Sequence, residues 1–247
     1  MKNLINLDNL PTKVKEFIKP YADKLIKIHQ DNLKCIMVYG SATQSEDFVQ
    51  KRSNINLLVI LGEISLQDLK KSAKLSRKRK IVPLFLTLKH INTSSDVFPI
   101  EFLEMKENNI LIYGEDVLKE VEIRTENIRL QCEEQLKGKL IRLRQAYLEI
   151  GTKHKAVERL MINSLTSLMP ILRNLLRLKG KKELPIKKRE IINVLSTEYE
   201  IPKSPLLKIL ESKLGISRLA KDEIEAIFDQ YLEILQRLAM AVDQLKI

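Results

Sequence analysis

The chain of 247 residues has no tryptophan, only seven glycines and only two cysteines. No apolar stretch approaches the roughly 18 uncharged residues of a membrane span. The N-terminal residues lack a signal-peptide pattern, so we expect a cytoplasmic protein. Cys35 and Cys132 have no Cys or His at metal-ligand spacing, which argues against both a disulfide and a zinc site. The isolated His29, His90 and His154 are expected at the surface or at helix caps.

The net charge of +11 is the strongest bias in the composition. Two clusters of Lys and Arg stand out, and such clusters attract polyanions such as nucleic acid. Neither cluster contains interleaved aromatic residues that could stack on bases, so a solvated basic face is the competing interpretation. The clusters consist of Lys70, Lys71, Lys74, Arg77, Lys78, Arg79 and Lys80, and of Arg177, Lys179, Lys181, Lys182, Lys187, Lys188 and Arg189.

The first half of the chain alternates strand and helix patterns. Apolar residues at spacings of three and four predict a helix over residues 12–31. The continuous apolar run 55–61 is typical of a strand buried on both faces. Pro83 places the strand 81–88 at a sheet edge or makes its start irregular. We also expect strands at 35–39 and 110–113, a basic helix at 65–79, and a short helix at about 95–105 capped by Ser94 or Ser95.

The second half carries helix patterns without strand signals. Gly151 and Gly180 are placed to end two long helices, and Pro170 should kink the second. The last helix repeats apolar residues in a 4-3-4-3 pattern, which is typical of a bundle seam. We therefore predict an α+β chain with a small mixed-sheet domain at residues 1–117 and an all-α helical bundle domain at residues 118–247.

The segment most informative about function is Val38-Tyr39-Gly40-Ser41, followed by Asn54-Ile55-Asn56. A strand delivers the chain to Gly40, where no side chain blocks the approach of a ligand. The following N–H groups and the Ser41 hydroxyl could bind phosphate. On the next strand Asn54 and Asn56 stand at i and i+2, so they share one face.

This spacing resembles the nucleotidyltransferase superfamily that includes DNA polymerase beta and kanamycin nucleotidyltransferase. The resemblance implies a bound nucleotide, ATP or another, at Gly40, Ser41, Asn54 and Asn56. In active relatives the two positions on the second strand are acids that hold Mg²⁺, whereas here both are amides. Phe98–Glu104 and the following Ile112-Tyr113-Gly114 resemble the family segment that carries a third carboxylate, for which Glu101 is the best match and Glu104 the second.

Three hypotheses follow. The first is a nucleotidyltransferase-fold protein with little or no transfer activity that binds a nucleotide or acts as a regulatory, partner-binding protein. The second is an active metal-dependent enzyme that moves a nucleoside monophosphate to a small molecule, a protein or an RNA. The third is a nucleic-acid-binding protein. The resemblance also implies a homodimer, and an additional carboxylate from the bundle, for which Glu133 and Glu134 are the matching residues.

Overall fold

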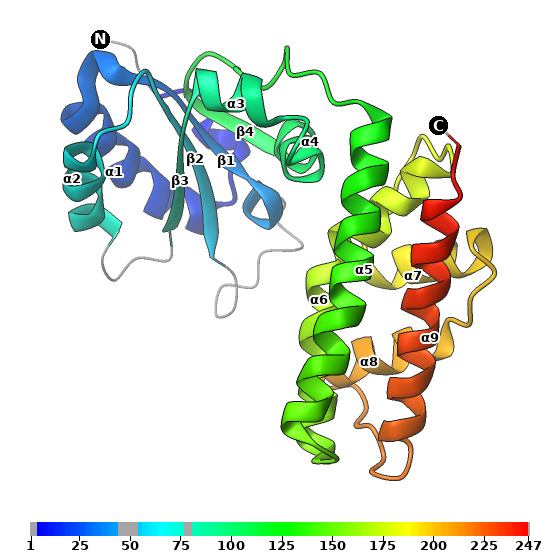
Figure 1. The fold of residues 1–247 in the computed structure, drawn as a ribbon. Helices are drawn as coiled ribbons and strands as arrows, with labels where there is room; N and C mark the ends of the chain where they lie inside the picture. The colour runs from blue at the N-terminus through cyan, green and yellow to red at the C-terminus, as the bar shows by residue number, and fades with distance from the viewer. Residues whose placement is uncertain (1–3, 44–53, 77–80, 247) are drawn as a thin grey trace. The chain divides into compact units, whose positions relative to one another are not determined.

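The computed structural model describes residues 4–43, 54–76 and 81–246. The chain divides into two compact units, Met1–Ile123 and Arg124–Ile247. The first unit contains the sheet, and the second contains only helices among its described residues (Figure 1).

The first unit is built on a four-stranded mixed sheet in the order β3-β2-β1-β4. β1 pairs antiparallel with both β2 and β4, and β2 pairs parallel with β3. The predicted edge position of Pro83 is confirmed, because β3 forms one edge of the sheet. The strands are β1 (Leu33–Tyr39), β2 (Ile55–Leu61), β3 (Ile81–Thr87) and β4 (Asn109–Gly114).

Helices cover both faces of this sheet (Figure 1). On one face α1 (Thr12–His29) contributes Val14, Ile18 and Leu25 to a core with residues of β1 and β2. On the other face the core includes residues from α3 (Leu88–Ser94) and α4 (Pro99–Glu107). The apolar run of β2 is buried because it contributes to both cores. A fourth helix, α2 (Leu66–Ser76), connects β2 to β3.

The expected short helix at about 95–105 is present as α4, but it begins later, at Pro99, and a separate helix, α3, precedes it. The Thr87 side chain caps α3 by accepting a hydrogen bond from the His90 N–H at 3.1 Å. Pro99 begins α4, where its missing N–H costs nothing and its fixed φ suits the first turn. Neither Ser94 nor Ser95 therefore caps the second helix.

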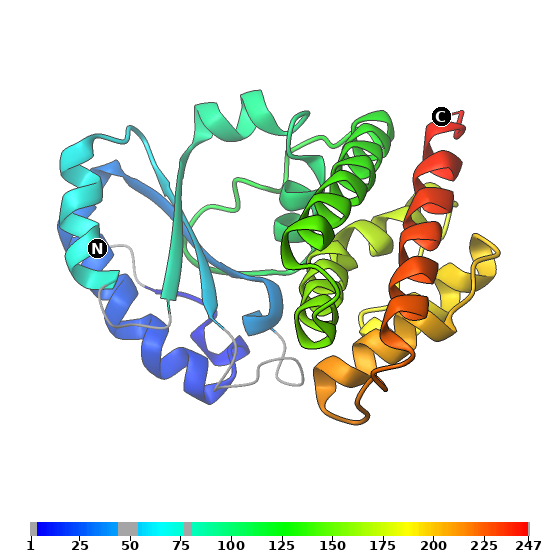
Figure 2. The same cartoon turned by 60° about the horizontal axis from the view of Figure 1, so that its bottom comes forward.

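The second unit is a helical bundle. The long helices α5, α6 and α9 pack against one another, and α7 and α8 pack on α6 (Figure 2). Gly151 ends α5 as predicted, since its N–H donates to the Tyr147 carbonyl at 2.9 Å. Inside the bundle the Ser164 and Tyr231 hydroxyls share a hydrogen bond of 2.9 Å. The helices are α5 (Thr125–Ile150), α6 (His154–Leu178), α7 (Lys188–Glu198), α8 (Ser204–Leu214) and α9 (Ile224–Asp243).

Helix α6 continues through Pro170, and the Asn174 amide donates to the Pro170 carbonyl at 2.9 Å. Within the described ranges, none of the helices is long and apolar enough to cross a membrane.

Candidate functional site

The turn at Gly40 is held by hydrogen bonds on both sides. Its N–H donates to the Asn108 carbonyl at 2.9 Å, and its own carbonyl accepts from the Thr43 hydroxyl at 2.8 Å. The Gly40 N–H is therefore committed to the neighbouring chain and does not face a ligand. Gly40 begins the short 3₁₀ helix η3 (Gly40–Thr43) with a φ of +73°, which favours glycine.

The second amide of the motif lies directly beside this turn. A Cβ added to Gly40 would meet the Nδ2 atom of Asn56 at 3.3 Å. Asn56 pairs across the sheet with Tyr39 and is half-buried, whereas Asn54 precedes β2 and is exposed. Burial raises the pKa of the Tyr39 hydroxyl, which therefore stays neutral near pH 7. The predicted proximity of Gly40 and Asn56 is thus present, and the side chain at this point is a neutral amide.

The sheet register reveals a position that the sequence pattern did not indicate. Val82 on β3 is the in-register neighbour of Asn56 on β2, and paired residues of parallel strands point to the same face. The Val82 side chain is 48% exposed at this edge of the sheet. The residue best placed on β3 to share a ligand with Asn56 is therefore apolar.

The two acids expected near the turn lie on α4. Glu101 is exposed in its first turn, and Glu104 follows one turn later. Glu104 is connected to the Gly40 turn, because its carboxylate accepts from the Asn108 amide at 3.4 Å while the Asn108 carbonyl holds the Gly40 N–H. These hydrogen bonds connect Glu104, the second match in the sequence, to the turn. The role of Glu101 stays a prediction.

Part of the motif region lies outside the described residues. Residues 44–53, which include Glu46 and Asp47, fall there, and Ser41 is described only by its backbone within η3. Among the described residues, no group of three or more His, Cys, Asp or Glu side chains could hold a metal ion.

The bundle carboxylate Glu133 is engaged in ion pairs. Arg129 Nη1 lies 2.8 Å from one carboxylate oxygen, and Lys137 Nζ lies 2.6 Å from the other. The hydrogen bond from Lys137 is the main cause that lowers the pKa of Glu133. Glu134 is exposed and accepts from the Gln135 amide at 3.0 Å. These contacts give Glu133 a structural role, and a catalytic role for the pair stays untested.

The basic clusters differ in how far acids neutralise them. In the second cluster Lys181 pairs with Glu198 and Arg189 with Glu211, each at 2.8 Å. In the first cluster the lysines of α2 are exposed, and residues 77–80 lie outside the described ranges. The paired charges weaken the second cluster as a polyanion site, and nucleic-acid binding by the first stays a prediction.

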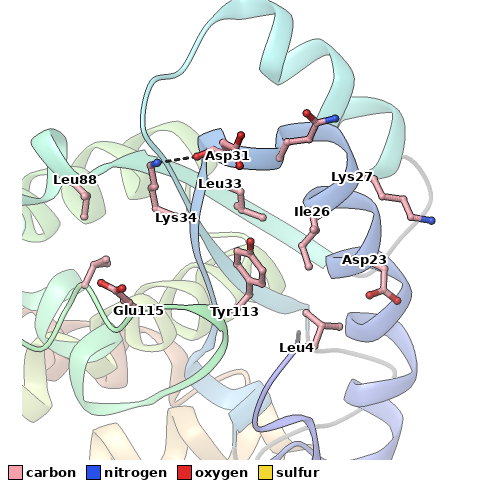
Figure 3. Close-up of a pocket in the computed structure, with 12 residues that line it drawn as sticks. Leu4, Asp23, Ile26, Lys27, Asp31, Leu33, Lys34, Leu88, Tyr113 and Glu115 are labelled. Carbon is pink, nitrogen blue, oxygen red and sulfur yellow. Dashed lines mark hydrogen bonds between the residues drawn. The ribbon is translucent and has the colours of Figure 1, made fainter. Parts of the chain in front are cut away.

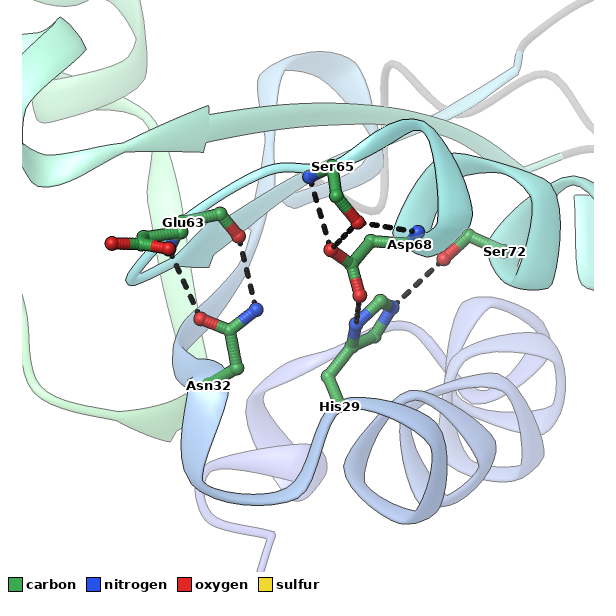
Figure 4. Close-up of polar contacts among 6 residues, drawn as sticks. All are labelled: His29, Asn32, Glu63, Ser65, Asp68 and Ser72. Carbon is green, nitrogen blue, oxygen red and sulfur yellow. Dashed lines mark hydrogen bonds and ion pairs between the residues drawn. The ribbon is translucent and has the colours of Figure 1, made fainter.

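The expectation that His29 lies at the surface or caps a helix was wrong. Its side chain is buried, with Nε2 2.8 Å from the Ser72 hydroxyl and Nδ1 3.6 Å from an Asp68 oxygen (Figure 4). Burial is the main cause that lowers the His29 pKa, which keeps the ring neutral near pH 7. These residue types resemble a nucleophile with its base, but Ser72 is only 2% exposed and Asp68 is occupied in capping α2 at Ser65. The cluster therefore joins α1 to α2.

A second polar contact fixes the end of the strands near this cluster. The Asn32 amide donates to the Glu63 carbonyl at 2.9 Å, and the Glu63 N–H donates to the Asn32 side-chain oxygen at 3.0 Å (Figure 4). This reciprocal pair ties the entry to β1 to the exit from β2. It stabilises the end of the sheet that lies opposite the Gly40 turn.

No protein-family model matches this chain, and no curated protein matches it. Among solved structures it is similar to spectinomycin adenyltransferase AAD(9) from Enterococcus faecialis, determined with ATP and spectinomycin. The two share 18% sequence identity and a TM-score of 0.58, over 90% of this chain and 98% of that chain. The likeness extends over the sheet unit and the helical unit, and with it the chain has the fold of a nucleotidyltransferase.

Proposed function

We propose that this protein binds a nucleotide, ATP or another, at the Gly40 turn and has little or no nucleotidyl-transfer activity. The similar structure of AAD(9) was determined with ATP, which makes a nucleotide the natural ligand to test. One observation carries the proposal: the side chain against Gly40 is the Asn56 amide, and its in-register neighbour on β3 is Val82. A regulatory or partner-binding role follows from a site that binds but does not react.

The residues at the turn lack the carboxylate ligands for Mg²⁺ that the family resemblance implies. Mg²⁺ is usually held by one or two carboxylates together with substrate phosphates. Asn54, Asn56 and Val82 supply no negative charge, so a metal there would lack its main protein ligands. Losing one electrostatic stabiliser in an active site costs roughly 10²–10³ in rate. Two neutral positions therefore predict a transfer rate several orders of magnitude below that of a carboxylate-bearing relative.

Calorimetry distinguishes metal-independent binding of ATP from binding that requires Mg²⁺. ATP is titrated into the protein in the presence of Mg²⁺ and, separately, in the presence of EDTA. We expect binding that changes little between the two conditions, because the protein offers the metal no charge. Binding that is lost with EDTA would contradict the proposal and favour an active, metal-dependent enzyme.

Restoring the carboxylates provides the sharper test. The variants are Asn54→Asp with Asn56→Asp, and the same pair with Val82→Glu, which adds an acid at the in-register position. Transfer of labelled AMP from ATP is measured with a panel of hydroxyl acceptors that includes spectinomycin. We expect transfer to appear only in the carboxylate variants. The control is Asn193→Asp, which makes the same chemical change at an exposed position on α7 of the helical unit. Wild type that transfers as fast as the variants would refute the proposal.

The alternative, an active enzyme, is favoured by one observation. Glu104 reaches the Gly40 turn through Asn108, so an acid is connected to the site despite the two amides. On this alternative the wild type transfers AMP and Glu104→Gln abolishes the transfer. Glu101→Gln is the companion variant, and it distinguishes which of the two α4 acids serves the site.

A further inference from the structure

The sheet unit has a cavity of about 940 Å³ beside the start of β1, lined by residues of α1, β1 and β4 (Figure 3). Its rim carries charges of both signs, since Lys27 and Lys34 line it together with Asp23, Asp31 and Glu115. Such a rim selects neither a cation nor an anion. The helical unit has a smaller hollow, and the side chains around that hollow are more specific.

A groove of about 370 Å³ runs between α5 and α9 on the surface of the helical unit. These two helices pack side by side (Figure 2). The rings of Tyr147 and Phe228 belong to its lining and stack on each other, with centroids 4.9 Å apart and planes inclined by 14°. Leu148 and Leu232 add further apolar surface. Because two stacked rings hold the helices at this point, the groove keeps its shape without a ligand.

Large apolar side chains are exposed along both helices that form the groove. Leu148 is 82% exposed, the highest fraction for any large apolar side chain in the described ranges. Ile141 lies two turns earlier on the same side of α5 and is 58% exposed. Met240 lies on the side of α9 that carries Leu232 and is 54% exposed. Exposed apolar side chains that gather around a groove mark an interaction surface.

The groove also carries charges of both signs that remain unpaired. Arg144, Glu225 and Asp229 line it, and all three are exposed. The Arg144 guanidinium donates to the Gln236 side-chain oxygen at 3.3 Å. Within residues 4–43, 54–76 and 81–246, neither Arg144 nor the two acids form an ion pair. One cation and two anions at this groove are therefore open to a partner.

We propose that a second copy of this chain occupies the groove in a two-fold symmetric contact. Leu148 of each copy then enters the groove of the other, and Arg144 of each copy pairs with Asp229 of the other. In a two-fold contact one surface meets itself, so that surface must carry both members of every contact. This surface carries an exposed leucine beside an apolar groove, and a cation beside two anions. It is thus complementary to itself in both shape and charge.

The size of the surface predicts a weak dimer. Between Glu225 and Met240, α9 extends for about 22 Å, and two adjacent helices are about 20 Å wide. A contact over this face covers about 450 Å² of each copy, or about 900 Å² in total. Stable specific interfaces bury about 1,200–2,000 Å². We therefore expect a reversible dimer that forms at high protein concentration.

Sedimentation velocity of the full chain at increasing concentration provides the first test. We expect the average mass to rise from that of the 28.7 kDa monomer toward that of a dimer. Leu148→Gln removes the side chain that enters the groove and should weaken self-association about tenfold or more, since burying a leucine is worth at least that factor. Leu214→Gln is the matched control, because Leu214 is an exposed leucine at the end of α8 outside the groove.

Charge reversal tests how the two copies pair. Arg144→Glu and Asp229→Arg each replace attraction between identical copies by repulsion, so each variant alone should stay monomeric. An equimolar mixture of the two variants should dimerise, because every contact between unlike copies then joins opposite charges. Arg159→Glu, an exposed change on α6 outside the groove, is the control and should leave self-association unchanged.

The outcomes are distinct. A chain that stays monomeric at every concentration overturns the proposal. Self-association that persists unchanged in Leu148→Gln and in both charge reversals also overturns it, since the copies would then meet through another surface. A mixture of the reversed variants that stays monomeric refutes the pairing of Arg144 with Asp229. Circular dichroism confirms the fold of each variant, and ATP affinity should be equal in all of them, because the inference does not depend on the nucleotide site.

Discussion

The Gly40 turn can be tested by a single added methyl group, Gly40→Ala. At φ +73° an alanine is strained by about 1–2 kcal/mol, because its Cβ crowds the following carbonyl. The new Cβ would also stand 3.3 Å from the Asn56 Nδ2 atom, so that amide must move by a few tenths of an ångström. We expect the free energy of unfolding to fall by about 1–2 kcal/mol. If the turn and Asn56 bind phosphate, one hydrogen bond to a charged group is lost, and ATP affinity falls roughly tenfold.

Gly180→Ala is the matched control for this variant. Gly180 has nearly the same φ, +80°, but a Cβ there would have nothing within 4 Å. Its backbone strain is therefore similar, but the added Cβ contacts no other side chain. Urea denaturation measures the stability of both variants, and calorimetry measures their ATP affinity. ATP binding that is equal in Gly40→Ala and Gly180→Ala would show that the turn is not the nucleotide site.

Three further predictions concern the sheet unit. Gly114→Ala should destabilise it by more than about 3 kcal/mol in urea denaturation, because a Cβ 1.9 Å from the Lys34 carbonyl oxygen forces the backbone apart; a loss below about 1 kcal/mol would contradict this close approach. Gln30→Gly should raise the free energy of unfolding by up to about 2 kcal/mol, since glycine relieves the strained φ, and an unchanged melting temperature would argue against that strain. Burial lowers the His29 pKa, so the unfolded chain binds more protons than the folded chain as pH falls below about 6.5. Stability should then decrease by up to about 1.4 kcal/mol per pH unit, and His29→Phe should remove that contribution from a urea–pH series.

Local sequence patterns are sufficient to predict those helices and strands whose ends are determined by their own residues. The apolar run at 55–61 predicted β2 with the observed bounds, because a strand buried on both faces must be apolar throughout. The ends of α8 are also marked by its own residues, with Pro205 in its first turn and the left-handed Gly215 at its end. Helix α3, which was not predicted, has a local signal in its cap Thr87, and the start of α4 has one in Pro99.

Contacts between distant residues could not be read from the sequence. The Gly40 to Asn56 contact was foreseen only because a known motif has this spacing. The position of Val82 beside Asn56 depends on the register of two parallel strands, and no local pattern on β3 fixes that register. His29 looked isolated because its partner, Ser72, lies 43 residues further along the chain. The position of Val82 and the burial of His29 both depend on contacts between residues far apart in the sequence. For this reason neither could be predicted from local patterns.

The register that places Val82 beside Asn56 also has a consequence in terms of the genetic code. An asparagine codon becomes an aspartate codon by a single base change, and a valine codon becomes an aspartate or glutamate codon in the same way. The positions 54, 56 and 82 can therefore acquire carboxylates one point mutation at a time. Because each of these residues is at least partly exposed, the intermediate sequences need not bury an unpaired charge. A population under selection for nucleotidyl transfer could thus acquire carboxylates at all three positions without passing through an unfolded protein.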